Sequence, residues 1–256
     1  AKGKAELVEA LPPSPQGIAI LNKDDPLVWS MRDKTHAQIF SYSAVNEADL
    51  FATDVLSEGL NGLSCKLHYQ GHAHPIITPL LGEFSVYTIL RATAVALSFG
   101  LGWDEIEHGL SITKVNLRMH PFILPNDVTI IDDTYNASPE STIAALQFLK
   151  DLPGRRVAIL GDMLELGPYE QAGHASVGAM IPGSADFLVL VGQRSKAIAQ
   201  AAIAKGFSED NLRWYPDSDQ AAQLVVKTIQ KGDVVLIKGS NSMHMDHILT
   251  ALQEYA

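Results

Sequence analysis

Three polar turns carry most of the residue types that could do chemistry in this chain. They span residues 132–139, 161–167 and 238–243, and each follows an apolar stretch typical of a buried strand. In an open parallel sheet, the loops that follow the carboxyl ends of the strands gather along one edge, where ligands bind. The sequence therefore predicts a polar site, rich in Asp, Asn, Ser and Lys, at that edge.

The first turn begins with two carboxylates, Asp132 and Asp133, which could accept hydrogen bonds from the hydroxyls of a ribose. Tyr135, Asn136 and Ser138 follow them and offer further donors and acceptors. An Asp- and Ser-rich turn before a proline is also ordinary chemistry for the start of a helix. Taken by itself, this turn leaves both interpretations open.

The second and third turns add a possible cation site and a possible anion site. Gly161 would let the backbone approach a ligand closely, and Asp162 and Glu165 could bind a cation or an ammonium group. Lys238 and Ser240 precede a predicted helix, where a lysine can contact a carboxylate or a phosphate. The alternatives are solvated turn carboxylates and a surface lysine.

The histidines do not predict a metal site. His244 and His247 share one face of the last predicted helix, and His72 and His74 lie in a Gly-rich segment. Since no Cys or carboxylate cluster accompanies them at zinc spacing, we expect structural or solvated histidines. The sequence also contains no Gly-x-Ser-x-Gly nucleophile motif and no Gly-x-x-x-x-Gly-Lys-Ser/Thr phosphate loop.

Composition limits the classes of partner. The formal net charge of -10 argues against nucleic acid or an anionic membrane as a partner. Cys65 is the single cysteine, which rules out an internal disulfide and fits a cytoplasmic location. No apolar run reaches membrane-spanning length, so we expect no membrane insertion. The chain starts without Met inside a helical pattern, and we therefore expect a fragment of a longer protein.

Strands and helices alternate regularly after about residue 115, which predicts an α/β domain with a Rossmann-like, doubly wound, mostly parallel sheet over residues 115–256. The expected strands are 128–132, 156–161, 186–191, 212–215 and 233–238. The expected helices are 139–151, 169–181, 194–205, 218–230 and 243–254.

Residues 1–114 are expected to form a separate, partial domain. Helical spacing over residues 1–11 places Leu7, Ala10 and Leu11 on one face. The other expected elements are strands at 17–21 and 38–42, small antiparallel strands within 50–78, and helices at 85–99 and 103–110.

Together, these residues resemble the Mur ligases of bacterial cell-wall synthesis, and most closely the branch that adds D-alanyl-D-alanine. That branch shows Asp-Asp-Ser-Tyr-Asn-Ala-Asn-Pro, Leu-Gly-Asp-Met-Leu-Glu-Leu-Gly and Lys-Gly-Ser-Arg. The corresponding stretches here are 132–139, 160–167 and 238–241. Residues 21–25 and 117–119 resemble its Asn-x-Asp and Gly-Arg-Met segments. The likeness spans essentially the whole chain.

The resemblance implies a fold that is incomplete at its start. Members of that family have a domain that holds a UDP-sugar, a central ATPase domain with a phosphate loop, and a C-terminal Rossmann-like domain that brings the amine. By this resemblance, residues 1–114 are the second half of the central domain and residues 115–256 are the C-terminal domain. The chain alone is expected to be inactive.

The resemblance also implies an ATP-dependent amide ligation with Mg²⁺. ATP would convert a carboxylate of UDP-N-acetylmuramoyl-tripeptide to an acyl phosphate, which the amine of D-Ala-D-Ala then attacks. One alternative is another ligase of the superfamily, of the folylpolyglutamate or cyanophycin type. The other is a non-catalytic nucleotide- or peptide-binding module. The sequence predicts no oligomeric state.

Roles carry over from the family to matching positions. Lys4 matches a carbamylated, metal-binding lysine that also serves catalysis, with Lys2 as a rival, and Arg118 matches a catalytic arginine that reaches the ATP phosphates. The nucleotide side is matched by Asn22, Thr88, Arg118 and one of Asp132 and Asp133. The D-Ala-D-Ala side is matched by Tyr135, Asn136, Ser138, Asp162, Ser240 and Lys238, the last also as a catalytic residue.

Three positions depart from the family pattern. Thr88 stands where an Asn near the adenine is usual, and it lacks the paired donor and acceptor of an amide. Asn241 replaces an Arg, which removes a bidentate carboxylate binder. Ser138 replaces an Asn.

Overall fold

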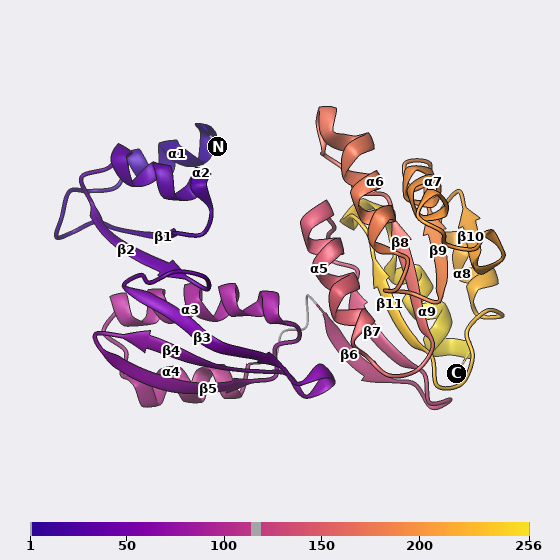
Figure 1. The fold of residues 1–256 in the computed structure, drawn as a ribbon, viewed down its shortest axis with the longest axis horizontal. Helices are drawn as coiled ribbons and strands as arrows, with labels where there is room; N and C mark the ends of the chain where they lie inside the picture. The colour runs from indigo at the N-terminus through magenta and orange to yellow at the C-terminus, as the bar shows by residue number, and fades with distance from the viewer. Residues whose placement is uncertain (1, 114–118, 256) are drawn as a thin grey trace. The chain divides into compact units, whose positions relative to one another are not determined.

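The structure, a computed structural model, describes residues 2–113 and 119–255. It divides into two compact units, Ala1–Lys114 and Val115–Ala256, which we call unit 1 and unit 2 (Figure 1). In each unit helices pack on a sheet, which confirms the predicted α/β class. None of the described helices has the length and apolar character needed to cross a membrane.

Unit 2 alternates strands and helices, as the sequence predicts. Its strands are β6 (His120–Ile123), β7 (Thr129–Asp133), β8 (Arg156–Gly161), β9 (Phe187–Val191), β10 (Leu212–Tyr215) and β11 (Val234–Lys238). Its helices are α5 (Pro139–Lys150), α6 (Glu170–Met180), α7 (Lys196–Ala204), α8 (Ser218–Val225) and α9 (Asp246–Tyr255).

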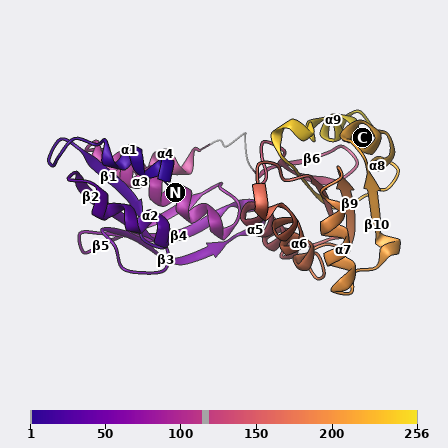
Figure 2. The same ribbon diagram turned by 90° about the horizontal axis from the view of Figure 1, so that it is seen from above.

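The sheet of unit 2 is doubly wound. Its order in the described residues is β10-β9-β8-β11-β7-β6, and all pairs are parallel except β6 with β7. The chain runs outward through β7, β8, β9 and β10 and then returns to insert β11 between β8 and β7. Helices α8 and α9 cover one face, and α5, α6 and α7 cover the other (Figure 2). The return of β11 brings the ends of β8, β11 and β7 side by side.

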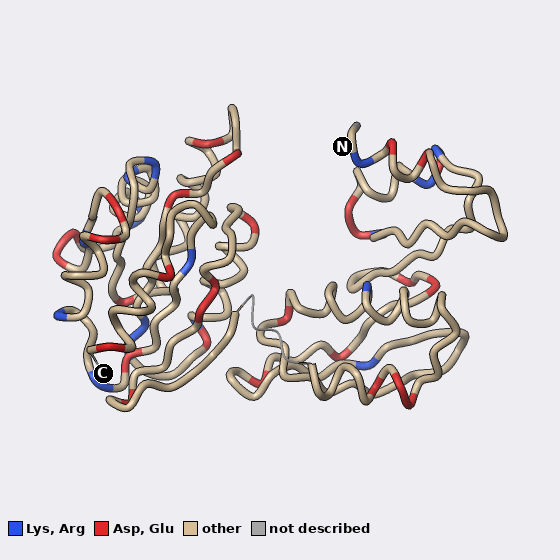
Figure 3. Tube along the Cα trace, turned by 180° about the vertical axis from the view of Figure 1, so that it is seen from behind, with Lys and Arg blue, Asp and Glu red and all other residues tan. Residues whose placement is uncertain are grey.

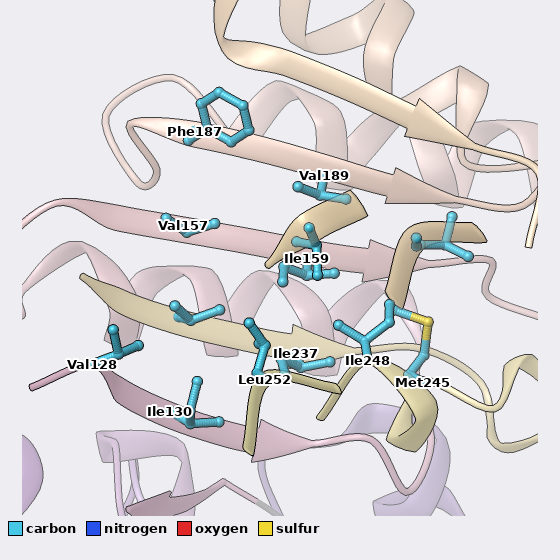
Figure 4. Close-up of a cluster of buried hydrophobic side chains, with 14 of the residues drawn as sticks. Val128, Ile130, Val157, Ile159, Phe187, Val189, Ile237, Met245, Ile248 and Leu252 are labelled. Carbon is cyan, nitrogen blue, oxygen red and sulfur yellow. The ribbon is translucent and has the colours of Figure 1, made fainter. Parts of the chain in front are cut away.

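The core of unit 2 lies on both faces of this sheet. Alternate strand residues point to opposite faces, so strands buried on both sides are apolar throughout. The face toward α8 and α9 is built from Ile130, Val157, Ile159, Val189, Ile237, Ile248 and Leu252 (Figure 4). The intervening strand residues, Ile131, Ala158, Leu160, Leu188 and Leu236, are also buried.

One strand and two helix boundaries in unit 2 differ from the sequence prediction by more than two residues. Strand β6 was not predicted, because it is short and contains Pro121, which is tolerated only at a sheet edge. Helix α8 ends at Val225, and the guanidinium of Arg155 binds the carbonyl of Thr228 beyond it. Helix α9 starts only at Asp246, after a 3-10 turn formed by residues Asn241–Met243.

Unit 1 contains a second sheet of mixed direction. Its strands are β1 (Ile18–Asn22), β2 (Gln38–Ser43), β3 (Leu50–Ser57), β4 (Leu63–Tyr69) and β5 (His72–Thr78), in that spatial order in the described residues. Strands β1, β2 and β3 pair in parallel, whereas β3, β4 and β5 pair antiparallel, as predicted for residues 50–78. The helices are α1 (Lys2–Glu9), α2 (Pro26–Trp29), α3 (Val86–Ser98) and α4 (Trp103–Ser111).

The predicted apolar face of the first helix is wrong. Ala5 is buried, whereas Leu7 is 74% exposed and Ala10 is exposed. Helix α1 ends at Glu9, so Leu11 does not continue its face. Acidic positions outnumber basic ones in both units (Figure 3).

Replacing Ile237 with alanine is expected to lower the free energy of unfolding of unit 2 by about 2–5 kcal/mol, because a fully buried side chain would leave a cavity. The same change at Ile123, which is 68% exposed on β6, should cost about 1 kcal/mol or less. Urea unfolding followed by circular dichroism measures both. Equal losses would contradict the central position of β11.

Candidate functional site

The three polar turns follow neighbouring strands on one edge of the unit 2 sheet. The first follows β7, the second follows β8, and the third follows β11, which lies between them. Lys238 at the end of β11 is in register with Asp133 on one side and Leu160 on the other. The turns therefore start at the same level of the sheet.

A buried ion pair ties the first turn to β11. The Nζ of Lys238 lies 2.5 Å from Oδ2 of Asp133 and donates a second bond of 2.8 Å to the carbonyl of Asn136. The backbone N–H of Met119 donates to Oδ1 of Asp133 at 3.3 Å. Lys238 is only 2% exposed and Asp133 only 4%. The two opposite charges thus pair away from water, and breaking the pair would remove this compensation from the charge that remains.

Around this pair, the first turn presents polar groups to solvent. Tyr135 and Asn136 are exposed. The Oδ1 of the half-buried Asp132 accepts bonds from the N–H and the hydroxyl of Thr134 at 3.0 and 2.8 Å. Among the described residues, its Oδ2 has no hydrogen-bond partner. Of the two carboxylates that the sequence left open, Asp132 is therefore the one with an oxygen available to a ligand.

Ser138 has the ordinary capping role that the sequence offered as an alternative. Its hydroxyl accepts a 3.3 Å bond from the N–H of Ser141 and caps α5, whose first residue is Pro139. This capping bond fixes the direction in which the chain leaves the first turn and starts α5.

The second and third turns hold one another through buried contacts. The hydroxyl of Ser240 accepts a 2.8 Å bond from the N–H of Leu164, and the Ser240 N–H donates to the carbonyl of Asp162 at 3.1 Å. The carboxylate of Asp162 accepts a 2.7 Å bond from the N–H of Ser195 and lies 3.6 Å from Arg194. Asp162 and Ser240 are both buried, so they position the two turns.

Three residues that the sequence analysis did not single out complete this arrangement. His174 is fully buried on α6, and its Nε2 accepts a 3.0 Å bond from the N–H of Met163. Its Nδ1 lies 2.8 Å from the carbonyl of Glu170, so Nδ1 carries the proton. Glu170 also pairs with Arg194 at 2.7 Å. In the sequence, His174 stands among small residues of a predicted helix, and nothing there indicated that its ring would hold the second turn.

A polar depression of about 440 Å³ lies beside the second turn. Arg194 contributes to its wall and also contacts Asp162. Its lining residues are Glu170, Gln171, Gln193, Arg194, Lys196, Ala197 and Gln200. The guanidinium of Arg194 is a donor suited to a carboxylate or a phosphate at this place.

The predicted site residues of unit 1 lie on separate elements. Lys4 is exposed on α1. Asn22 ends β1, and its side-chain oxygen accepts a 3.0 Å bond from the N–H of Asp24. Thr88 is exposed on α3, where it lines an apolar depression of about 650 Å³. Arg118 lies outside the described residues.

Asp24 is the centre of a polar cluster after β1. Its carboxylate accepts hydrogen bonds from Ser43, Asn46 and Tyr87 and from the N–H of Ala44. Partial burial raises the pKa of Asp24, but these bonds together outweigh it and leave the pKa below its ordinary value. Burial and the nearby Asp24 charge raise the pKa of Tyr87 to about 12.

Two family models match this chain, one in each unit. The family model for the Mur ligase middle domain matches residues 1–96, and the model for the Mur ligase glutamate ligase domain matches residues 117–241. The chain belongs to the Mur ligase family.

Within the Mur ligases, the chain is similar to enzymes named UDP-N-acetylmuramoyl-tripeptide–D-alanyl-D-alanine ligase. It is 34% identical to the Escherichia coli enzyme and 31% identical to the Bacillus subtilis enzyme, in each case over 99% of the chain. It is also similar to a crystal structure of MurF from Acinetobacter baumannii, with a TM-score of 0.85 and 27% identity over 99% of the chain. These matches confirm the resemblance seen in the motifs.

The Mur ligase chain spans about half the length of the relatives it matches. It covers 55% of the Escherichia coli enzyme, 54% of the Bacillus subtilis enzyme and 55% of the Acinetobacter baumannii chain. One departure from the family pattern has a physical explanation here: Ser138 replaces an Asn, and both residues are good helix caps. Asn241 and Thr88, the other two departures, are exposed.

Replacing Lys238 with methionine should lower the free energy of unfolding of unit 2 by about 3–5 kcal/mol, because the buried carboxylate of Asp133 would lose its ion pair with Lys238. Replacing Asp133 with leucine as well should recover part of that loss. Urea unfolding of the single and double variants gives the coupling between the two side chains. Lys231→Met, at an exposed ion pair with Asp127, is the matched control and should cost about 1 kcal/mol or less. Strictly additive losses at Lys238 and Asp133 would contradict the pair.

Asp24→Asn should destabilise unit 1 at pH 7, and the difference from the wild type should shrink below about pH 4. The pKa of Asp24 is lower in the folded state, so its ionised form stabilises the fold above the ordinary pKa. That contribution disappears as the pH falls through the folded pKa. Thermal unfolding from pH 7 to pH 3 tests this, with the exposed Asp33→Asn as control. A difference that grew on acidification would refute it.

Proposed function

We propose that this chain is part of a ligase that uses ATP to join D-Ala-D-Ala to UDP-N-acetylmuramoyl-tripeptide in peptidoglycan precursor synthesis, in the cytoplasm. The observation that carries the proposal is the match to ligases of that name over 99% of the chain. The match includes the polar turns at 132–139 and 160–167. Both turns follow strands of unit 2 and lie on one edge of its sheet.

In this proposal, residues 1–114 form the second half of a central ATPase domain and residues 115–256 form the C-terminal domain. ATP would phosphorylate the tripeptide carboxylate to an acyl phosphate, and the amine of D-Ala-D-Ala would displace the phosphate to form the new amide bond. A carboxylate is a poor electrophile at neutral pH, so the uphill amide bond needs this coupling. The rest of the chemistry is positioning and charge stabilisation.

The first turn supplies the groups for binding. The available oxygen of Asp132 would accept hydrogen bonds from the ribose hydroxyls of the nucleotide. Tyr135 and Asn136, both exposed, would contact the D-Ala-D-Ala substrate. Lys238 and Asp133 would act on these groups by fixing the turn, since Lys238 holds the carbonyl of Asn136.

Other proposed roles come from family positions. Asn22 and Thr88 are assigned to the nucleotide, Arg118 to its phosphates, and Asp162, Ser138 and Ser240 to the substrate side, where they position the turns. Lys4 is exposed, so its amine is accessible to CO₂. A carbamate there would provide the hard oxygen ligands that Mg²⁺ prefers. Bound Mg²⁺ would neutralise charge on the transferred phosphoryl group.

We also propose that the 256-residue chain does not hydrolyse ATP alone. Its sequence contains no Gly-x-x-x-x-Gly-Lys-Ser/Thr motif, whose backbone N–H groups and lysine would hold the phosphates. ATP turnover by the purified chain would overturn this part of the proposal. Ligation assays on the intact ligase with D-Ala-D-Ala and with other amine acceptors separate the proposed ligase from a folylpolyglutamate- or cyanophycin-type ligase. Calorimetry of the chain with ADP and with D-Ala-D-Ala separates it from a non-catalytic binding module.

Asp132→Ala in the intact ligase is expected to raise the KM for ATP about 10- to 100-fold, because hydrogen bonds to a charged group contribute about 1.5–3 kcal/mol. Steady-state kinetics at saturating D-Ala-D-Ala measures the effect. Lys205→Ala, an exposed lysine of unit 2 outside the turns, is the control. An unchanged KM in a folded Asp132→Ala variant would remove Asp132 from the nucleotide site.

A further inference from the structure

Two histidines and a carboxylate meet at the start of α9. One ligand atom each from His244, Asp246 and His247 lies within 4.8 Å of the others, and all three side chains are exposed. The two imidazole rings stack with centroids 5.5 Å apart. The sequence predicted solvated or structural histidines here because no carboxylate cluster accompanied them at zinc spacing. In the structure, Asp246 supplies the carboxylate beside these two imidazole rings.

The backbone beneath these side chains is firmly held. Met245 and Ile248, which alternate with them, are buried in the core of unit 2 (Figure 4). His244 has a left-handed backbone conformation, with φ of 50° and ψ of 46°, and its carbonyl accepts a 3.1 Å bond from the N–H of His247. The chain therefore turns so that His244 returns to the side of the helix that carries His247.

A second carboxylate reaches the cluster from another helix. Oδ1 of Asp219, on α8, lies 2.6 Å from Nδ1 of His247, although the two residues are 28 positions apart in the sequence. A carboxylate that accepts the Nδ1 proton of a histidine fixes the ring and leaves Nε2 with its lone pair for a metal. This carboxylate–histidine arrangement is the usual support of a metal-binding imidazole.

We propose that His244, Asp246 and His247 bind one divalent transition-metal ion of the zinc type, and that Asp219 orients His247. A tetrahedral zinc ion with ligands at about 2.0–2.2 Å holds them about 3.4 Å apart, so small rotations of exposed side chains close the site. Three protein ligands leave the fourth position to water. Two imidazole nitrogens select Zn²⁺, Ni²⁺ or Cu²⁺ over Mg²⁺, which prefers oxygen ligands.

The proposed ion would have a structural role: it would hold the end of the third polar turn in place and would take no part in the ligation reaction. His244 directly follows the 3-10 turn Asn241–Met243, which Ser240 begins. A bound ion would fix the end of that turn against α8 and α9. Occupancy is therefore expected to stabilise unit 2 against unfolding, since the unfolded chain does not hold the three ligands together.

The test is zinc binding by the 256-residue chain. After dialysis against ZnCl₂ in excess Mg²⁺, metal analysis should find one tightly held zinc ion per chain, and the unfolding temperature should rise. Cobalt titration should give the visible absorption of a Co²⁺ ion in a low-symmetry site. His244→Asn, which tolerates the left-handed backbone, and His247→Gln should each abolish the bound zinc, the rise in unfolding temperature and the cobalt absorption. Asp219→Asn should weaken binding about 10- to 100-fold.

The matched control removes two other exposed histidines, His36 and His108, in one double variant, which should keep the zinc, the cobalt spectrum and the rise in unfolding temperature. Circular dichroism of each variant without metal verifies that it is folded. The proposal is overturned if the wild type holds no zinc against excess Mg²⁺. It is equally overturned if folded His244→Asn and His247→Gln variants bind zinc as the wild type does.

Discussion

The candidate site of this Mur ligase chain depends on one charged lysine, buried at the end of β11 against the first polar turn. Lys238 satisfies its charge with the carboxylate of Asp133 and uses a further N–H to hold the carbonyl of Asn136. Burying two ions is costly unless each finds its partner and further hydrogen bonds. The pair therefore helps to hold the first turn in the observed conformation, in which Asp132 is half-buried and Tyr135 and Asn136 are exposed. The exposed side chains of this turn are polar, whereas the ion pair beneath them is buried.

Sheet topology determines which turns can meet. Because β11 is the last strand of unit 2 to be made but lies between β8 and β7, residues more than 100 positions apart become neighbours. The same double winding places α8 and α9 together on one face, which brings Asp219 to His247. A single topological feature thus creates the polar edge and brings Asp219 to the histidine cluster.

The alternating pattern of unit 2 could be predicted because its strands are apolar throughout and its turns are marked by Asp, Gly and Pro. Strand β6 could not, since four residues with a proline give no periodicity, and the face of α1 was wrong because a two-turn helix constrains its packing weakly. At the site, residue types identified the turns, but not which side chains are buried. Asp162 and Ser240 are polar in sequence yet buried, and His174 and Arg194 gained their roles only from tertiary contacts.

The unpredicted strand β6 has a consequence for how this protein behaves at high concentration. It covers one side of β7, so the boundary of the parallel sheet is a short antiparallel strand and not a long apolar one. Pro121 in that strand offers no N–H to an incoming chain. Strand β6 is therefore a poor partner for a strand of another molecule, which disfavours fibrillar aggregation through this edge of the sheet.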